Sequence, residues 1–328
     1  MNPTEDAVAW LDEYRALVAT AGLVDLGHRT QIELAGADRA SFLHNLSTNE
    51  IRKLAVGSGV EAFLTNVQGK TLAHGFVFAG ETSLVFETVG GQSAAILKHL
   101  DHYLVCEQVE LFDRSQEWCE LLLAGPATSS LLASVCEGPL PQARLAHRTA
   151  SLAGQSVSVR RVEWTGPEGL LISGKNDAMA AVRTTLAESG AAPCGEAAFT
   201  AARIEWGLPL FGSDITEANL PQEIARDPLA ISFTKGCYLG QETVARIDAL
   251  GHVNKTLVGV RFRGAAVPPV GTSLSAGGQV FGQVTSSSFS PCLNSALALG
   301  YVRRGSNQPG AALTSAMGEA EVVALPVR

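Results

Sequence analysis

Residues 235–246 carry the side chains with the clearest capacity for chemistry and read Lys-Gly-Cys-Tyr-Leu-Gly-Gln-Glu-Thr-Val-Ala-Arg. The thiol of Cys237 lies between Gly236 and Gly240, and a glycine on each side of it permits a tight turn. The residues from Gln241 onward are good helix formers, so a helix is predicted to start there. Cys237 is therefore expected at or just before a helix N-terminus.

A thiol in that position has two reasons to be reactive. The partial positive charge of a helix start and the ammonium of Lys235 both favour the thiolate over the thiol. The alternative is a small buried cysteine in an ordinary loop, which is the more frequent role of a lone cysteine. The polar neighbours of Cys237 favour the first interpretation, so Cys237 and Lys235 are the candidate catalytic residues.

The composition describes a globular chain with a sizeable core. Its 328 residues are 46% hydrophobic and 17% charged, which suits two or three domains. The 24 basic and 32 acidic side chains give a net charge of -8, which argues against broad binding of a phosphate backbone. No direct nucleic-acid partner is expected.

The cysteines and the N-terminus bear on metal content and location. Six cysteines form no C-x-x-C pair, so no metal site is expected, and a reducing compartment explains them without disulfides. The first residues are acidic and amphipathic, unlike a signal or transit sequence. No run of 18 apolar residues exists, so neither a membrane span nor a membrane partner is expected. A cytoplasmic location follows as an expectation.

The predicted secondary structure on the two sides of residue 251 differs, which indicates a domain boundary there. Before it, helices and strands mix without a strict βαβ order, which predicts an α+β region of antiparallel sheets over residues 1–250. After it, apolar residues alternate with period two between Pro, Gly and Ser turns, which predicts a β-barrel over residues 251–328. The helices are predicted over 7–19, 38–46, 92–103, 128–135, 177–189 and 196–206, and the strands over 31–34, 60–65, 71–78, 83–88, 105–112, 118–123, 157–164 and 170–173.

Residues 235–246 resemble the signature K-G-C-[YF]-x-G-Q-E-x-x-x-R of the YgfZ family. These folate-binding proteins are similar in fold to the aminomethyltransferase, or T-protein, of the glycine cleavage system. Residues 22–29, 46–50 and 202–209 also look like blocks shared by YgfZ and T-protein sequences. The resemblance implies an aminomethyltransferase-like region of two interwoven antiparallel-sheet subdomains with helices, plus a C-terminal β-barrel, in a ring around a ligand channel.

The resemblance also implies a set of folate-binding residues. A pterin presents a donor edge to a carboxylate and a flat face to an aromatic or guanidinium group, and Glu205 is the expected carboxylate. Phe199 and Arg29 stand where some relatives place tryptophans, and either side chain can stack on a ring. Gln241 is expected to contact the ligand or the thiol, and Arg246 a carboxylate tail. The alternatives are a helix-surface role for Glu205, a core role for Phe199, and a contact of Arg29 with the folate tail or solvent.

One departure from the T-protein pattern concerns the reaction. The aminomethyltransferases have a pair of aspartates after the glycine turn at residue 69, and one of them assists the reaction with tetrahydrofolate. This chain has Ala73 and His74 there. Loss of such a group commonly lowers a rate by about 10² or more, so it is uncertain that the chain is an enzyme. His74 is expected to be a partly buried structural residue.

Three functions remain open. The leading hypothesis, from the resemblance, is a tetrahydrofolate-binding accessory protein that supports iron-sulfur cluster assembly or repair in client enzymes, including tRNA-thiolating enzymes. Its partners would be folate and those clients or assembly proteins, with folate in the channel and Cys237 near its mouth. The alternative is a folate-dependent aminomethyl or other one-carbon transferase. A scaffold without folate is the third.

Overall fold

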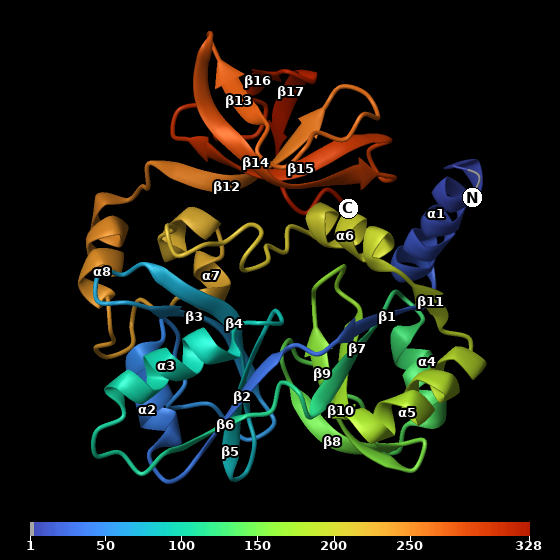
Figure 1. Cartoon of the computed structure of the whole chain (residues 1–328), viewed down its shortest axis with the longest axis vertical. Coiled ribbons are helices and arrows are strands. Elements are labelled where there is room, and N and C mark those ends of the chain that lie inside the picture. The colour runs from blue at the N-terminus through green and yellow to red at the C-terminus, as the bar shows by residue number, and fades with distance from the viewer. Residues whose placement is uncertain (1–2) are drawn as a thin grey trace.

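The computed structural model describes residues 3–328, with side chains from Trp10 onward. It contains two sheets and a closed barrel, which meet as three bodies around a common centre (Figure 1). The sheet pairs are antiparallel, except that β11 runs parallel to β1. The predicted α+β class with a C-terminal barrel is confirmed.

The first sheet has the strand order β3-β4-β5-β2-β6. Helices α2 (Arg39–Leu46) and α3 (Ser93–Tyr103) pack against it and share one apolar cluster with its strands. The strands are β2 (Thr30–Ala35), β3 (Gly59–Thr65), β4 (Thr71–Ala79), β5 (Ser83–Thr88) and β6 (Glu110–Asp113).

The second sheet has the order β11-β1-β7-β10-β9-β8. Helices α4 (Thr128–Val135) and α5 (Asn176–Glu188) cover it on the side away from the first sheet (Figure 1). The strands are β1 (Gly22–Gly27), β7 (Trp118–Ala124), β8 (His147–Leu152), β9 (Gln155–Val162), β10 (Gly169–Lys175) and β11 (Ala192–Cys194).

The two sheets are interwoven, because β1 belongs to the second sheet while β2 to β6 form the first. Side chains of β4 and β7 alternate between two cores, as the strand period of two requires. Phe76 and Phe78 of β4 join Leu122 of β7 in the cluster between the sheets, whereas Val77 faces the helices. Both faces of these strands are buried, which explains their nearly continuous apolar sequences.

Helix α6 (Glu196–Trp206) connects the sheets to the barrel by packing against both α1 (Pro3–Ala19) and β14. The barrel closes in the order β12-β15-β14-β13-β16-β17. Its strands are β12 (Lys255–Phe262), β13 (Ser273–Ala276), β14 (Gln279–Ser290), β15 (Ser295–Arg303), β16 (Ala312–Ser315) and β17 (Gly318–Val323). Between α6 and the barrel lie η1 (Pro221–Ile224), α7 (Asp227–Ala230) and α8 (Gln241–Leu250).

The structure differs from the sequence prediction most at β1, β6, β8 and β11, and no strand is predicted over β1 (Gly22–Gly27). The strand predicted over 105–112 is the shorter β6, because residues 105–109 form a loop with Val105 exposed. Strand β8 escaped prediction because it lies at a sheet edge and buries only Ala150 and Leu152 fully. Strand β11 has only three residues and contains a proline.

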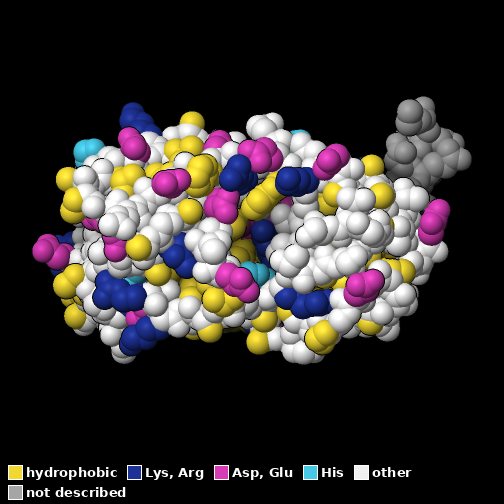
Figure 2. Space-filling model, turned by 90° about the horizontal axis from the view of Figure 1, so that it is seen from below, with side chains coloured by type: hydrophobic (Ala, Val, Ile, Leu, Met, Phe, Trp, Pro, Cys, Tyr) yellow, Lys and Arg dark blue, Asp and Glu magenta, His cyan; other side chains and the backbone are white. Residues whose placement is uncertain are grey.

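The surface carries charges of both signs. On the face opposite the barrel, acidic and basic side chains are interspersed, and basic and histidine side chains lie in a depression near the middle (Figure 2). Within residues 3–328, none of the helices combines the length and apolar character needed to cross a bilayer.

Candidate functional site

A buried pocket lies where the two sheets meet the segment that follows α6. Its walls include Arg29 from the β1–β2 turn, His74 of β4, Trp164 from the β9–β10 turn, Phe199 of α6 and Phe211. The free space is about 10 Å³, which is room for about one water molecule. We call it the central pocket. The sequence placed Arg29 and Phe199 in a shared site, and the structure brings both to this pocket.

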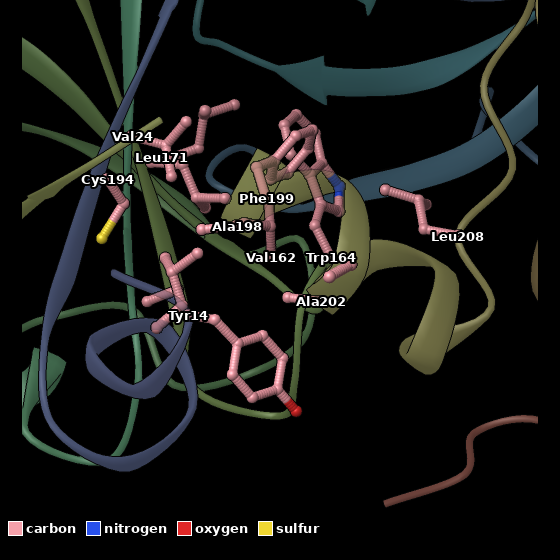
Figure 3. Packing of buried hydrophobic residues seen from close by; sticks show 14 of the residues in the cluster. Tyr14, Val24, Val162, Trp164, Leu171, Cys194, Ala198, Phe199, Ala202 and Leu208 are labelled. Atoms are coloured by element: carbon pink, nitrogen blue, oxygen red, sulfur yellow. The ribbon is translucent and has the colours of Figure 1, made fainter. Parts of the chain in front are cut away.

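Trp164 supplies the ring on which the central pocket is built. The guanidinium carbon of Arg29 lies 4.7 Å from the centre of the Trp164 ring, and the Phe76 ring lies 5.4 Å away on a tilted plane. Phe199 projects from α6 toward Trp164 in the same apolar cluster (Figure 3). The indole nitrogen of Trp164 is buried without a hydrogen-bond partner among the described groups. The sequence analysis missed Trp164, because only its place at the end of a strand was visible.

His74 belongs to a buried ion cluster rather than to a free acid or base. Its Nε2 lies 2.8 Å from Oε1 of Glu61. Arg226 donates to both Glu61 oxygens, at 2.7 and 2.6 Å, and Arg144 also donates to this carboxylate. Burial alone would raise the pKa of Glu61, but Arg226 and the hydrogen bond with His74 hold it well below its usual range. The expected structural role of His74 agrees with this arrangement.

Glu205 has a different environment from the one expected of a pterin ligand. Its carboxylate accepts from the hydroxyls of Tyr14 and Ser290, from the backbone N–H of Cys292 at 3.2 Å, and from Nε of Arg328 at 2.9 Å. A carboxylate has about four acceptor positions, so these donors occupy them all. In the structure this side chain joins α1, α6, the barrel and the C-terminal residue, and its contact with a pterin stays a prediction.

The surroundings of Tyr14 agree with that structural role. The Tyr14 hydroxyl points out of the apolar cluster (Figure 3), and burial together with Glu205 raises its pKa. A tyrosine that stays protonated keeps donating to the carboxylate. Helix α1 is thereby tied to α6 through one buried hydrogen bond.

Cys237 is exposed. It lies three residues before Gly240, the N-cap of α8, so its predicted position just before a helix start is confirmed. Lys235 is buried, and its ammonium donates to the carbonyls of His44, Ser47 and Asn49 at 2.6, 2.6 and 2.8 Å. Burial lowers the pKa of Lys235 to about 7, whereas three carbonyl acceptors favour its charged form. Lys235 thus fastens residues 235–240, which we call the cysteine loop, to the C-terminal end of α2. Its catalytic role stays a prediction.

The start of α8 is fixed by two glycines in contact. Gly240 has a φ of 82°, and a Cβ built on it would lie 2.5 Å from the carbonyl oxygen of Asn66. A Cβ on Gly69 would likewise lie 3.0 Å from the Gly240 carbonyl oxygen. The backbones of the β3–β4 turn and the cysteine loop are therefore so close that a side chain at either glycine would collide with the other segment.

The remaining predicted ligands lie apart from the central pocket. Gln241 is the first residue of α8 and is half-buried. Arg246 is exposed on α8 and lines a separate groove with Leu250 and His252. Tyr238 of the cysteine loop and Phe211, which lines the central pocket, belong to one apolar cluster. Cys237 is exposed, whereas Glu205 is fully buried, and neither lines the central pocket.

Comparison with known proteins identifies the family. Residues 3–231 match the GCVT N-terminal domain, and residues 255–327 match the glycine cleavage T-protein C-terminal barrel domain. The chain belongs to the GCVT family. The resemblance noted from the sequence is confirmed at this level, that of the T-protein-like superfamily.

Two curated relatives and one solved structure show how far the GCVT similarity extends. The chain is 30% identical over 313 residues to an aminomethyltransferase of Symbiobacterium thermophilum, covering 89% of this chain and 81% of that protein. It is 28% identical over 301 residues to an aminomethyltransferase of Thermus thermophilus, covering 91% and 84%. The crystal structure of glycine cleavage system aminomethyltransferase T from Bartonella henselae matches with a TM-score of 0.86 at 22% identity, over 96% of this chain and 88% of that one. This last similarity concerns the fold.

Proposed function

We propose that this GCVT family chain binds a tetrahydrofolate in the central pocket and acts as an accessory protein for iron-sulfur cluster assembly or repair. The observation that carries the first part is the convergence of Arg29, Trp164 and Phe199 in one buried pocket between the subdomains. Flat rings and a guanidinium are the neighbours that a pterin ring prefers. A pterin needs more than 10 Å³, so a wall must move, and residues 208–210, which lie outside helices and strands, form one wall.

The arrangement at Ala73 and His74 supports an accessory role over aminomethyl transfer. Ala73 is fully buried and has no acidic group, and His74 already pairs with Glu61. The Glu61 carboxylate is neutralised by Arg226 and Arg144, so it is not free to take or give a proton near neutral pH. This part of the site lacks the carboxylate that the T-protein reaction uses.

The loop that carries Cys237 supports a role toward other proteins. It matches the full YgfZ signature, and its thiol is exposed while its backbone is fastened by Lys235 and Gly240. A rigid loop that presents a thiol at the surface suits contact with a client or assembly protein. In the proposed function, folate occupies the central pocket and Cys237 acts at this separate surface.

Two assays on the purified protein test the proposal. Calorimetric titration with 5-formyltetrahydrofolate is expected to show saturable binding at micromolar concentrations. With glycine-cleavage partner proteins, aminomethyl transfer is expected to stay at the level seen without the chain. Absence of folate binding would contradict the pocket assignment and favour a scaffold without folate.

The second candidate function is folate-dependent aminomethyl transfer. The observation that favours it is that two relatives named aminomethyltransferase match most of this chain. Turnover comparable to that of an authentic T-protein in the assay above would establish this candidate and overturn the accessory role.

A further inference from the structure

Arg29 is restrained on one edge and on one face. Its Nε donates to Oε1 of Glu87 and lies 3.4 Å from Oε2 of Glu120, while the plane of its guanidinium covers Trp164. An arginine held by two carboxylates and an aromatic ring has little freedom to change its rotamer. The direction of its remaining N–H groups is therefore fixed.

Those remaining N–H groups have no partner in the protein. Among the groups that the structure describes, neither terminal nitrogen of Arg29 makes a hydrogen bond, although the residue is only 9% exposed and lines the central pocket. Neither nitrogen is among the fully buried polar atoms without a partner, so both stay accessible to a molecule that enters the pocket. The fork of a guanidinium matches a carboxylate or a carbonyl oxygen.

Two further buried groups behind Arg29 are not used by the proposed function. Glu87 and Glu120 are fully buried, and each keeps one oxygen without a hydrogen-bond partner among the described groups. Arg160 donates to the other oxygen of Glu120 at 2.8 Å. Burial and the neighbouring Glu87 raise the pKa of Glu120 to about 7. Glu120 therefore changes its charge near neutral pH while it faces Arg29.

We propose that Glu87 and Glu120 are positioning residues that hold Arg29 against Trp164, so that Arg29 donates to an oxygen acceptor of the ligand. This inference rests on the proposed folate site and specifies how that site recognises its ligand. The Glu205 carboxylate already accepts from four protein donors. We therefore expect the ligand to be recognised by the guanidinium of Arg29, which donates, rather than by a carboxylate that accepts from the donor edge of a pterin. The acceptor is a pterin carbonyl or a carboxylate of the tail.

The proposal implies that binding depends on pH through Glu120. When Glu120 is ionised, it and Glu87 balance Arg29 and Arg160. When Glu120 is protonated, the cluster carries a net positive charge, which favours an oxygen acceptor. Affinity is therefore expected to rise as the pH falls through about 7. The charged and polar groups that act on Glu120 are Arg29 of the β1–β2 turn, Glu87 of β5, Arg160 of β9 and Ser173 of β10. Gln31 of β2 accepts hydrogen bonds from Arg160 and Ser173 in the same cluster.

The test is a titration with 5-formyltetrahydrofolate at about pH 6 and about pH 8, on either side of the pKa of Glu120. Arg29→Gln is expected to weaken binding by about tenfold or more, because a charged hydrogen bond is lost. Glu120→Gln is expected to remove the pH dependence. The matched control is Arg183→Gln, which removes a half-exposed arginine paired with Asp25 outside the pocket.

Fragments of the ligand identify the acceptor. If Arg29 donates to the pterin carbonyl, Arg29→Gln weakens binding of a tetrahydropterin without a tail. If Arg29 donates to a carboxylate of the tail, the same variant weakens binding of p-aminobenzoylglutamate. Unchanged affinity of Arg29→Gln for every ligand, or a pH dependence that persists in Glu120→Gln, overturns the inference. Should Arg29→Gln fold poorly because buried carboxylates lose their partner, the pair Arg29→Gln with Glu87→Gln keeps the charge balance.

A measurement without ligand separates this inference from the proposed function. The emission of Trp164, obtained by comparison with Trp164→Phe, reports on the guanidinium above its ring. A pH transition near 7 that is present in the wild type and absent in Glu120→Gln supports the positioning roles even if folate does not bind. A wild-type emission that is flat with pH contradicts them even if folate does bind.

Discussion

Glu205 connects three parts of the molecule through one carboxylate. Its donors come from α1, the barrel and the C-terminal residue. Removing the carboxylate in Glu205→Ala leaves Arg328 and the Tyr14 hydroxyl without their acceptor. Because a buried ion pair is broken, we expect a loss of about 3–5 kcal/mol in the free energy of unfolding, measured by chemical denaturation.

The exposed Glu242 provides the control for that experiment. Glu242→Ala is expected to change the free energy of unfolding by no more than about 0.5 kcal/mol. If Glu205→Ala kept full stability and lost folate binding, Glu205 would be a ligand residue rather than a structural one.

Cys237 is exposed and lies apart from the central pocket. In Cys237→Ser, we therefore expect unchanged folding and unchanged folate affinity, together with loss of the activity of cluster-dependent enzymes in cells that rely on this chain. Cys106→Ser, which removes another exposed thiol, is the control. Full enzyme activity with Cys237→Ser would show that the thiol has no role.

The candidate site could be predicted in part from single residues. The resemblance placed Arg29 and Phe199 in one site because their positions align with known ring contacts. Trp164 was missed because its contact with Arg29 joins residues far apart in sequence, which no local pattern reports. The contacts of Lys235 could not be predicted for a similar reason, since its carbonyl partners lie far earlier in the chain, at residues 44, 47 and 49.

At the scale of elements, the cysteine loop depends on the close approach of Gly240 to the β3–β4 turn. In Gly240→Ala, the new methyl group would meet the Asn66 carbonyl at a backbone angle that favours glycine. We expect a loss of about 1–3 kcal/mol in the free energy of unfolding. Gly236→Ala in the same loop has open space and is expected to be neutral. Equal stability of the two variants would contradict this account of the loop.

Lys235 fastens the same loop to α2. In Lys235→Met, three buried carbonyls lose their donor, so we expect a loss of about 1–3 kcal/mol in the free energy of unfolding. The thiol of Cys237 is expected to react faster with a thiol reagent, because the loop is freed. Lys98→Met, at an exposed site on α3, is the control. A labelling rate that matches the wild type would argue against the positioning role of Lys235.

A helix such as α3 could be predicted because its apolar residues recur on one face: its buried residues, Ile96 and Leu100, are one turn apart, and its predicted and observed bounds nearly coincide. The barrel also follows from local alternation. The pairing of β1 with β7 and β11 could not be predicted, since nothing in the sequence of β1 indicates which distant strands lie beside it.

For the whole molecule, the free energy of unfolding depends on pH through two buried carboxyl groups, Glu61 and Glu120, and the two dependences have opposite signs. The pKa of Glu61 is lowered, so its contribution to stability is lost as the pH falls below the ordinary range of a glutamate. The pKa of Glu120 is raised to about 7, so the folded state holds a proton that the unfolded state releases. The contribution of Glu120 to stability is therefore expected to decline as the pH rises from about 5 to about 7.

Denaturation of Glu120→Gln across that pH range checks the second dependence. The variant is expected to lack the decline, whatever its stability at a single pH. Parallel curves for the wild type and the variant would show that Glu120 does not titrate there.

We propose that tetrahydrofolate occupies the central pocket between the two sheet subdomains and α6. Hydrogen exchange measured with and without 5-formyltetrahydrofolate tests it most directly, because bound ligand slows the opening of the segments that enclose it. We expect protection in the turns around Arg29 and Trp164 and in residues 208–211, with no change in the cysteine loop. Protection confined to other segments, or none at saturating ligand, would show that folate does not bind in the central pocket.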